Sequence, residues 1–343
     1  MRYPRALRKG DTVGICAPSA GVPENQYPRL DNARKNIEAL GFSVMETTHV
    51  RSGGHGLVSA PADVRAAEFM ALYENPDVAL ILPPWGGEFL MDMLPLLDFD
   101  KLLTLPPKWV SGYSDITTLT FAMTLRADIA TVHGANLMNL GGAFIHPMDK
   151  ALFAMLSITD STDYTQHSAG FTGSFAHFND ISAAPYEPTQ PSRWQSLYGD
   201  GAQVFSGRVI GGCLDVICKL IGTPFAPVHA FLDTYKPDGF VWALERCEMT
   251  PADIYRTLWQ MRQCGWFRGA AGILVGRPDG CTPMHSGYGC VDALRQAFDG
   301  LDIPVLYDTD IGHIPPQIQL VNGAIADVAY AGGEATIMQR VMV

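Results

Sequence analysis

The sequence predicts an α/β protein, with a parallel-sheet domain that is followed by a second, smaller α/β domain. Up to residue 156, short apolar runs alternate with segments whose apolar residues recur at helical spacing, which is typical of strand–helix–strand units. The run over residues 78–82 is apolar throughout, as expected for a parallel strand buried on both faces. The length of 343 residues exceeds what one hydrophobic core usually contains, so we expect two domains.

The N-terminal domain, expected over residues 1–156, alternates strands and helices in order. Apolar residues from Leu30 to Leu40 recur at helical spacing, and Gly41 follows where a glycine commonly ends a helix. The other strands and helices of this domain are expected as strands at 12–17, 42–46, 78–82 and 109–112, and helices over 64–73, up to about residue 97 and from about residue 115.

The second half of the chain begins after an irregular segment. Residues 157–206 are rich in Thr, Ser, Gly and Pro and lack periodicity, so we expect a linker that includes an active-site loop. The C-terminal domain is expected over residues 207–343, with Thr250 capping one of its helices. Its further elements are expected as a helix over 211–220, strands at 240–244, 273–275 and 305–306, and a hairpin of 324–330 with 334–342.

Composition and charge exclude several classes of protein. Lys and Arg number 24 and Asp and Glu 35, a net charge of −11 that argues against nucleic acid or an anionic membrane as the partner. The N-terminus lacks the apolar run of a signal peptide, and no segment reads as a membrane span. The seven cysteines are scattered without C-x-x-C or zinc-type spacing, which favours reduced thiols, no metal and a cytoplasmic location.

The most informative local motif surrounds Ser114. An apolar strand runs into Gly112 and a helix is expected directly after Ser114, so the hydroxyl lies on a strand-to-helix turn next to the free amide of Asp115. Such a turn exposes a nucleophile and offers a donor to an oxyanion. The match to the hydrolase motif G-x-S-x-G is incomplete because Ile116 replaces the second glycine. The alternative is that Ser114 only caps the helix.

Three further positions carry chemistry. Gly86 and Gly87 follow a parallel strand, where they either complete an oxyanion hole or form a tight turn. Glu245 ends an apolar strand and needs a partner, which is a histidine, Arg246 or a backbone cap. His313 lies in a loop framed by Gly and Pro, and His133 is its rival as catalytic base.

Several strings resemble the LD-carboxypeptidase family along essentially the whole chain. The resemblance rests on Gly-Asp-Thr-Val-Gly-Ile-Cys-Ala-Pro-Ser, Trp-Gly-Gly, Leu-Pro-Leu-Leu-Asp-Phe-Asp, Gly-Tyr-Ser-Asp-Ile-Thr, Val-His-Gly-Ala, Gly-Arg-Val-Ile-Gly-Gly-Cys-Leu, Ala-Leu-Glu and Gly-His-Ile-Pro-Pro-Gln, in this order. Two positions depart from the family pattern. Glu88-Phe89 follow the glycines where an aromatic residue or Asn is usual, and Arg246-Cys247 follow the glutamate where an acidic or polar pair is more common.

The resemblance implies an N-terminal domain similar to class I glutamine amidotransferases and a serine carboxypeptidase with a Ser-Glu-His triad. On the matching positions, Ser114 is the nucleophile, His313 the base and Glu245 the orienting acid. The oxyanion amides come from Asp115 and from Gly87 or Gly86. It also implies a homodimer without metal or cofactor.

Two subgroups of the family act on different substrates. One removes the terminal D-alanine of murein tetrapeptides in peptidoglycan recycling. The other, the microcin C immunity (MccF-like) subgroup, hydrolyses aspartyl-nucleotide conjugates and gives antibiotic resistance. Trp194 lies in a long loop where such members carry a base-stacking tryptophan, so we favour the second subgroup. The alternative is that Trp194 packs on the domain seam.

Two functions outside this reaction remain to be weighed. A non-catalytic binding protein on the same fold would be expected to lack Ser, Glu or His of the triad, and all three are present. A glutamine amidotransferase would need Cys at position 114. We therefore expect an enzyme acting on a small peptide or peptidyl-nucleotide.

Overall fold

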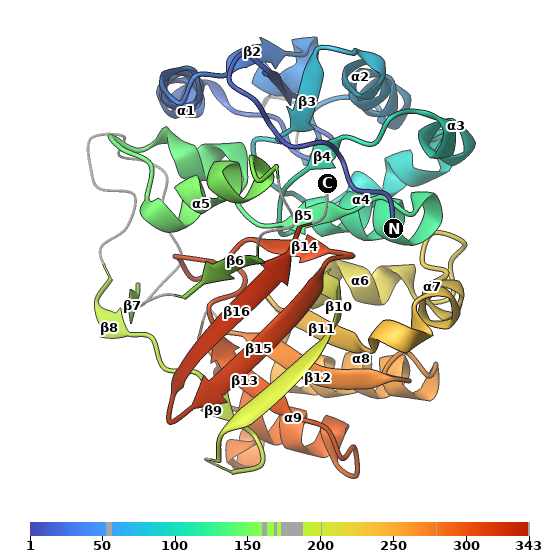
Figure 1. Cartoon of the computed structure of the whole chain (residues 1–343), viewed down its shortest axis with the longest axis vertical. Coiled ribbons are helices and arrows are strands. Elements are labelled where there is room, and N and C mark those ends of the chain that lie inside the picture. Colours follow the sequence, from blue (N-terminus) through green and yellow to red (C-terminus); the bar gives the residue numbers. More distant parts are fainter. Residues whose placement is uncertain are drawn as a thin grey trace.

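The computed structural model contains two main sheets arranged one above the other, as Figure 1 shows. It describes residues 1–52, 57–159, 163–167, 170–172, 188–199, 201–278 and 280–341. The upper sheet is built from the N-terminal half and the lower one mainly from the C-terminal half. This arrangement confirms the predicted class, a parallel-sheet α/β domain with a second sheet domain. The limits 1–156, 157–206 and 207–343 remain predictions.

The first sheet has four parallel strands in the order β2-β1-β3-β4. All four residues of β3 are buried, as the apolar run predicts. Its strands are β1 (Thr12–Ile15), β2 (Ser43–Glu46), β3 (Val78–Ile81) and β4 (Trp109–Val110). Its helices are α1 (Tyr27–Ala39), α2 (Ala62–Glu74), α3 (Phe99–Thr104), α4 (Ile116–Ala127) and α5 (Pro147–Leu156).

One predicted helix has a different form. The helix expected to end near residue 97 is a 3-10 helix, η3 (Leu90–Leu96), with Pro95 inside it. Proline has no backbone N–H and clashes with the preceding turn, which disfavours a regular α-helix there. Helix α1 ends as predicted, because Gly41 adopts a φ of 93° just beyond it.

The second sheet is mixed and has eight strands in the order β6-β16-β15-β10-β11-β12-β13-β9. Strands β10 to β13 are parallel to one another, and β15 and β16 form the predicted hairpin. The strands are β6 (Asp163–Gln166), β9 (Gln195–Ser196), β10 (Gln203–Cys213), β11 (Phe240–Glu245), β12 (Ala270–Gly276), β13 (Val305–Thr309), β15 (Ile325–Ala331) and β16 (Glu334–Arg340).

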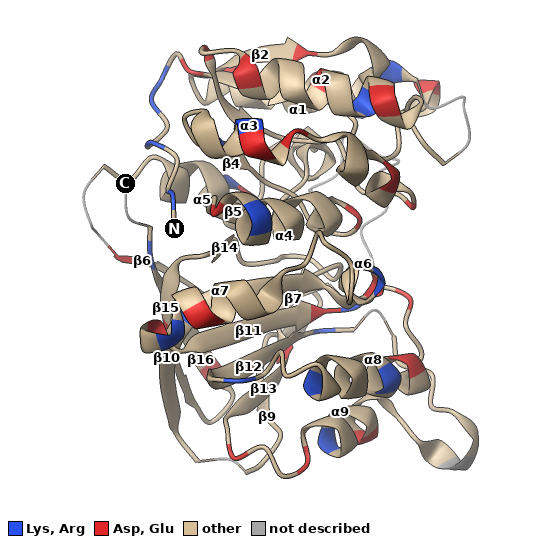
Figure 2. Cartoon of the chain, turned by 90° about the vertical axis from the view of Figure 1, so that its right-hand side faces the viewer, with Lys and Arg blue, Asp and Glu red and all other residues tan. Residues whose placement is uncertain are grey.

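The helices of this half lie beside the second sheet, where α6, α7 and α8 are seen to its right in Figure 1. On the described residues, the colours of Figure 2 show basic and acidic residues interspersed along these helices rather than gathered by sign. The helices are α6 (Leu214–Leu220), α7 (Val228–Thr234), α8 (Pro251–Gln263) and α9 (Cys290–Phe298). Thr250 caps α8 as predicted, because its hydroxyl accepts a hydrogen bond from the amide of Asp253.

The longest strand, β10, was not predicted because it contains three glycines. These glycines fit a close approach to β11: a Cβ at Gly211 would lie 1.9 Å from the carbonyl oxygen of Ala243, and one at Gly207 would lie 2.8 Å from the amide of Phe240. Glycine normally weakens a strand, so a sequence pattern reads it as a break. The predicted helix over 211–220 therefore starts later, at Leu214.

The segment expected to be irregular contributes to the sheets where it is described. Strand β6 extends the second sheet at one edge and β9 extends it at the other. Two more short strands, β7 (Gly170–Phe171) and β8 (Gln190–Pro191), pair with each other. Of the expected active-site loop, residues 183–197, the first part up to residue 187 lies outside the described residues.

A strand from the C-terminal half joins the N-terminal half. Strand β14 (Leu320–Asn322) pairs antiparallel with β5 (Thr131–His133), and Leu320 lies opposite His133. Figure 1 shows this pair between the two main sheets. The loop before β14 contains His313, so this pairing brings His313 toward β5 and the adjacent segment that leads from β4 into Ser114.

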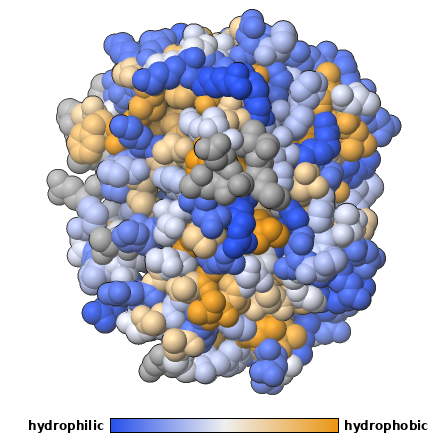
Figure 3. Space-filling view, viewed as in Figure 1, coloured by the Kyte–Doolittle hydropathy of each residue, from blue (hydrophilic) through white to orange (hydrophobic). Residues whose placement is uncertain are grey.

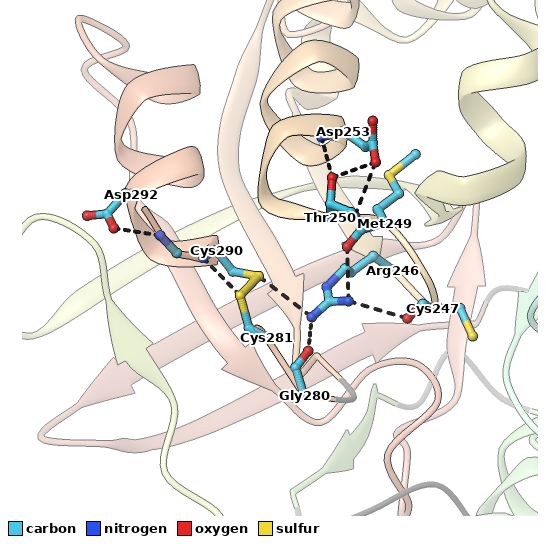
Figure 4. The surroundings of a disulfide bond; sticks show 10 residues. Arg246, Cys247, Met249, Thr250, Asp253, Gly280, Cys281, Cys290 and Asp292 are labelled. Atoms are coloured by element: carbon cyan, nitrogen blue, oxygen red, sulfur yellow. Dashed lines mark hydrogen bonds between the residues drawn. A yellow bond between two sulfur atoms is a disulfide. The ribbon is translucent and has the colours of Figure 1, made fainter. Parts of the chain in front are cut away.

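Two cysteines do not fit the predicted set of reduced thiols. Cys281 and Cys290 form a disulfide, and Cys16, Cys213, Cys218, Cys247 and Cys264 are free. The two cysteines are 9 positions apart in the sequence, a spacing unlike the C-x-x-C motif, so the pattern gave no sign of the pairing. Figure 4 shows Arg246 beside this disulfide, donating hydrogen bonds to the carbonyl oxygens of Gly280, Cys247 and Met249.

The surface offers no extended apolar area in the view of Figure 3, where hydrophobic residues lie in separate groups among hydrophilic ones. Within the described ranges, no helix has the length and apolar character needed to cross a membrane.

Candidate active site

Ser114 lies on the predicted strand-to-helix turn between β4 and α4. Its φ of 61° is in the left-handed region, which is uncommon for a residue other than glycine. A left-handed residue between a strand and a helix projects its side chain out of the turn, as nucleophiles of hydrolases do. Ser114 is partly exposed and lines a cleft of about 660 Å³.

The Gly86 backbone passes directly beside Ser114. A Cβ at Gly86 would lie 2.8 Å from the Ser114 hydroxyl and 2.9 Å from the amide nitrogen of Asp115, so only glycine fits. A Cβ at Gly87 would point elsewhere, 2.4 Å from the Ser19 hydroxyl. Gly87 itself lines the cleft. The predicted oxyanion segment and the predicted nucleophile therefore meet.

The Asp115 carboxylate holds three segments of this region together. It is buried and accepts hydrogen bonds from the Ser19 hydroxyl at 2.6 Å, from the Leu90 amide at 2.9 Å and from the Thr118 hydroxyl at 3.2 Å. These bonds link the loop after β1, the loop after the glycines and the start of α4. Sequence reasoning assigned Asp115 only through its amide and missed Ser19, whose position after the first strand was the available signal.

The partner of Glu245 is His313. Glu245 ends β11 and is fully buried, and its Oε2 lies 2.8 Å from Nδ1 of His313. Gly312 makes this approach possible, since a Cβ there would lie 2.6 Å from the same carboxylate oxygen. Arg246, the alternative partner, points instead at the carbonyl oxygens seen in Figure 4.

Each member of the pair stabilises the charged form of the other. Burial alone would lower the pKa of His313, but the Glu245 carboxylate and the neighbouring Cys247 outweigh it and raise this pKa above its usual value. Burial would likewise raise the pKa of Glu245, yet the charge and hydrogen bond of His313 hold it below its usual value. The imidazole must therefore lose a proton before it can act as a base.

His133, the rival histidine, lies on the other side of Glu245. Its Nε2 is 3.9 Å from Oε1 of Glu245, and the ring is buried. Burial lowers the pKa of His133 to about 4, and the charge of His313 adds to this against the opposing effect of Glu245. His133 is thus neutral at ordinary pH and is removed from the cleft.

The nucleophile and the base are connected through Tyr113, and no hydrogen bond joins Ser114 and His313 among the described residues. The ring of Tyr113, the residue before Ser114, packs edge-on against the His313 ring with 5.0 Å between centroids. Within the described part of the chain, the Ser114 hydroxyl makes no hydrogen bond. Catalytic hydrogen bonds are often long in ligand-free structures and shorten when substrate binds.

The cleft beside Ser114 is lined by both halves of the chain. The N-terminal half contributes Gly87, Glu88 and Asp115, and the C-terminal half contributes Asp215 and Arg256 among others. Asp215 is already occupied, because its two oxygens accept hydrogen bonds from the amides of Cys247 and Glu248. The walls of the cleft therefore contain charged side chains, and Asp215 holds the backbone at Cys247 and Glu248 in place.

Two of the thiols that line the cleft, Cys213 and Cys218, do not compete with Ser114. Burial, followed by the nearby Glu245, raises the pKa of the Cys213 thiol well above its usual value, and burial also raises the pKa of Cys218. Both remain protonated at neutral pH and are weak nucleophiles. Among the described residues, no group of three or more His, Cys, Asp or Glu side chains is arranged to hold a metal ion.

Trp194 lies outside this cleft, contrary to the stacking role expected for it. Its side chain is only 4% exposed and packs with Phe205, Leu306 and other core residues of the second sheet. Its indole N–H donates to Asp310 at 3.0 Å, and its amide donates to Gly333. Proline and aromatic residues suggested a loop over the site, but the adjoining Gln195 and Ser196 form an edge strand that anchors Trp194 to the sheet.

Two family models match the chain. The model of the LD-carboxypeptidase N-terminal domain matches residues 13–134, and that of the LD-carboxypeptidase C-terminal domain matches residues 206–328. Ser114 lies in the first match, and Glu245 and His313 lie in the second.

Relatives resemble the chain over nearly its whole length. A probable murein peptide carboxypeptidase of Bacillus subtilis is 28% identical over 97% of this chain and 93% of its own length. The microcin C7 self-immunity protein MccF of Escherichia coli is 24% identical over 97% of this chain and 95% of its own.

Solved structures have the same fold. A mutant of MccF in complex with adenosine monophosphate gives a TM-score of 0.82 at 24% identity, covering 98% of both chains. The muramoyltetrapeptide carboxypeptidase of Oxalobacter formigenes gives 0.74 at 19% identity, covering 96% of this chain and 98% of its own. Together with the two family matches, these likenesses establish that the chain belongs to the LD-carboxypeptidase family.

Proposed function

We propose that this protein is a serine carboxypeptidase in which Ser114, His313 and Glu245 form the catalytic triad. The observation that carries the proposal is the buried Glu245–His313 pair, with its 2.8 Å contact, next to a serine held at a left-handed strand-to-helix turn. If Ser114 only capped helix α4, neither its left-handed backbone nor a buried acid–base pair would be needed. The Tyr113–His313 ring contact connects the two parts.

The proposed reaction has two half-steps. His313 takes the Ser114 proton as the hydroxyl attacks the substrate carbonyl, and Glu245 holds the ring in the tautomer that leaves Nε2 facing the serine. The amides of Asp115 and Gly87 donate to the oxyanion, with Gly86 allowing the close approach. His313 then gives its proton to the leaving amine, and water hydrolyses the acyl-enzyme by the same route.

Two substrate classes compete for this site. Hydrolysis of aminoacyl- or peptidyl-nucleotide conjugates is supported by MccF structures, one of which is a complex with aspartyl sulfamoyl adenosine. Release of terminal D-alanine from a murein tetrapeptide is supported by the Bacillus subtilis relative, whose identity to this chain is higher. The buried position of Trp194 withdraws the stacking argument that favoured the first class.

A direct comparison of substrates tests the proposal. The protein is incubated separately with a murein tetrapeptide and with aspartyl sulfamoyl adenosine, and products are identified by mass spectrometry. We expect cleavage of one of them by the wild-type protein and of neither by Ser114→Ala. Equal turnover by wild type and Ser114→Ala would overturn the proposal. Light scattering on the same sample tests the homodimer that the family resemblance implies.

A further inference from the structure

The second oxygen of the buried Glu245 carboxylate has an unusual environment. Its Oε1 faces Nε2 of His133 at 3.9 Å. Both atoms are buried, and neither has a hydrogen-bond partner among the described residues. Buried polar atoms almost always have a partner, and a closure of about 1 Å would bring these two into hydrogen-bond range. The two atoms are therefore poised to pair with each other.

The neighbours of His133 fix where its proton lies. The Thr117 hydroxyl accepts a hydrogen bond from the amide of Cys213 at 3.3 Å, and it also lies 3.4 Å from Nδ1 of His133. Since Nδ1 is the only acceptor found for this hydroxyl among the described residues, the hydroxyl proton is directed at Nδ1. A neutral ring that accepts at Nδ1 carries its own proton on Nε2, toward Glu245.

The fold provides room for this arrangement. His133 is the last residue of β5 and lies opposite Leu320 of β14, so its backbone is held by this strand pairing. Gly212 faces it, and a Cβ there would lie 3.2 Å from Nδ1. Thr117 is the second residue of α4, the helix that follows Ser114, so this helix links the turn of the nucleophile to the histidine.

We propose that His133 is a positioning residue that donates its Nε2 proton to Oε1 of Glu245 and so fixes the carboxylate that orients His313. The proposal rests on the triad proposed above and adds a second histidine to it. One carboxylate then lies between two rings: a charged one at Oε2 that takes part in proton transfer, and a neutral one at Oε1 that does not.

This arrangement has a consequence for the base. A hydrogen bond donated to Oε1 makes the carboxylate less basic, which limits how far Glu245 raises the pKa of His313. Loss of the donor should raise this pKa further. The other titratable groups that face the pair are Tyr113, Cys213 and Cys247.

Two substitutions separate positioning from packing. His133→Leu removes the donor, and His133→Gln retains an N–H near the position of Nε2. For His133→Leu we expect kcat to fall roughly 10–100-fold, as for other groups that orient a ligating or reacting side chain, with little change in KM. The acidic limb of the kcat/KM profile should move to higher pH. His133→Gln should have a kcat and an acidic limb close to those of the wild type.

Matched controls distinguish the possible outcomes. Thr131→Val alters a buried hydrogen bond in the same strand without touching Glu245, so it should lower the melting temperature and leave the acidic limb unchanged. A loss of kcat in His133→Leu without a shifted limb, and without recovery in His133→Gln, would overturn the proposal. Activity retained in Ser114→Ala would instead refute the triad.

A spectroscopic measurement tests the tautomer without any substrate. Long-range ¹H–¹⁵N correlation spectra of the wild-type protein labelled at histidine distinguish protons on Nδ1 and Nε2. We expect His133 to be neutral and protonated at Nε2 near pH 7, with loss of that preference in Thr117→Val. A charged ring, or a neutral ring protonated at Nδ1, would contradict the inference even if the variants fail to fold.

Discussion

The part of the site formed by residues 19–115 is made largely of backbone, whereas the part formed by Glu245 and His313 is made of buried side chains. The first depends on the left-handed backbone of Ser114 and on Gly86, where there is no room for a Cβ. The second depends on a carboxylate and a ring that are brought together across 68 residues of sequence. Local backbone geometry thus positions the oxyanion donors in the first region. Tertiary packing positions the charged side chains in the second.

The largest effects are expected where the two regions meet. Ser114→Ala removes the nucleophile and His313→Ala removes its base, so each should lower kcat by on the order of 10⁴ or more. Circular dichroism and thermal melting should show an intact fold for Ser114→Ala, because this side chain is partly exposed. Near-normal turnover in either variant would show that Ser114 and His313 do not act in one catalytic mechanism.

Glu245→Gln tests the buried region by its charge. We expect kcat to fall by roughly 10³–10⁴, less than for Ser114→Ala. Because Glu245 raises the pKa of His313 in the wild type, activity should be lost as the pH falls through a value above about 6.5. Without the carboxylate this acidic limb should move to lower pH. An unmoved limb in the kcat/KM profile would exclude His313 as the titrating group.

Gly86→Ala tests the backbone region. Its new Cβ would lie 2.8 Å from the Ser114 hydroxyl, so the nucleophile and the Asp115 amide must shift apart. We expect kcat to fall by about 10²–10³ with a smaller change in KM, the range seen when one oxyanion donor is lost. Gly201→Ala, where the Cβ meets nothing within 4 Å, should behave as wild type. Equal kinetics for the two variants would count against the oxyanion assignment.

Trp194→Ala is expected to have the smallest effect on catalysis and a large one on stability. Loss of a buried indole and of its bond to Asp310 should lower the free energy of unfolding by about 3–5 kcal/mol. At a temperature where the variant is folded, kcat/KM for the two candidate substrates should change by the same factor. A selective loss with the nucleotide conjugate, in denaturant-controlled kinetics, would restore the stacking hypothesis.

The two regions also differ in how far the sequence predicts them. The strand, turn and helix around Ser114 follow from local periodicity and residue preference, and the structure has them where expected. The partner of Glu245 was open among His313, Arg246 and a backbone cap. Only the pairing of β14 with β5 brings His313 to it, and such a long-range pairing leaves no local pattern.

Strand β10 and the position of Trp194 were predicted wrongly, each for a physical reason. Strand β10 was hidden because glycine is a strand breaker except where another backbone approaches closely, as Ala243 does at Gly211. Trp194 was assigned to the cleft because it lies in an irregular segment where members of the resembled subgroup carry a base-stacking tryptophan. Its neighbours are instead an edge strand, and edge pairing over two residues is too short to read from a sequence.

The most direct test of the central claim is covalent labelling of the nucleophile. The wild-type protein is treated with a small fluorophosphonate, and the adduct is located by intact-mass and peptide-level mass spectrometry. We predict a single adduct on Ser114, formed faster as the pH rises through the pKa of His313 and strongly slowed in His313→Ala. An adduct on another residue, or equal labelling of Ser114 with and without His313, would contradict the account.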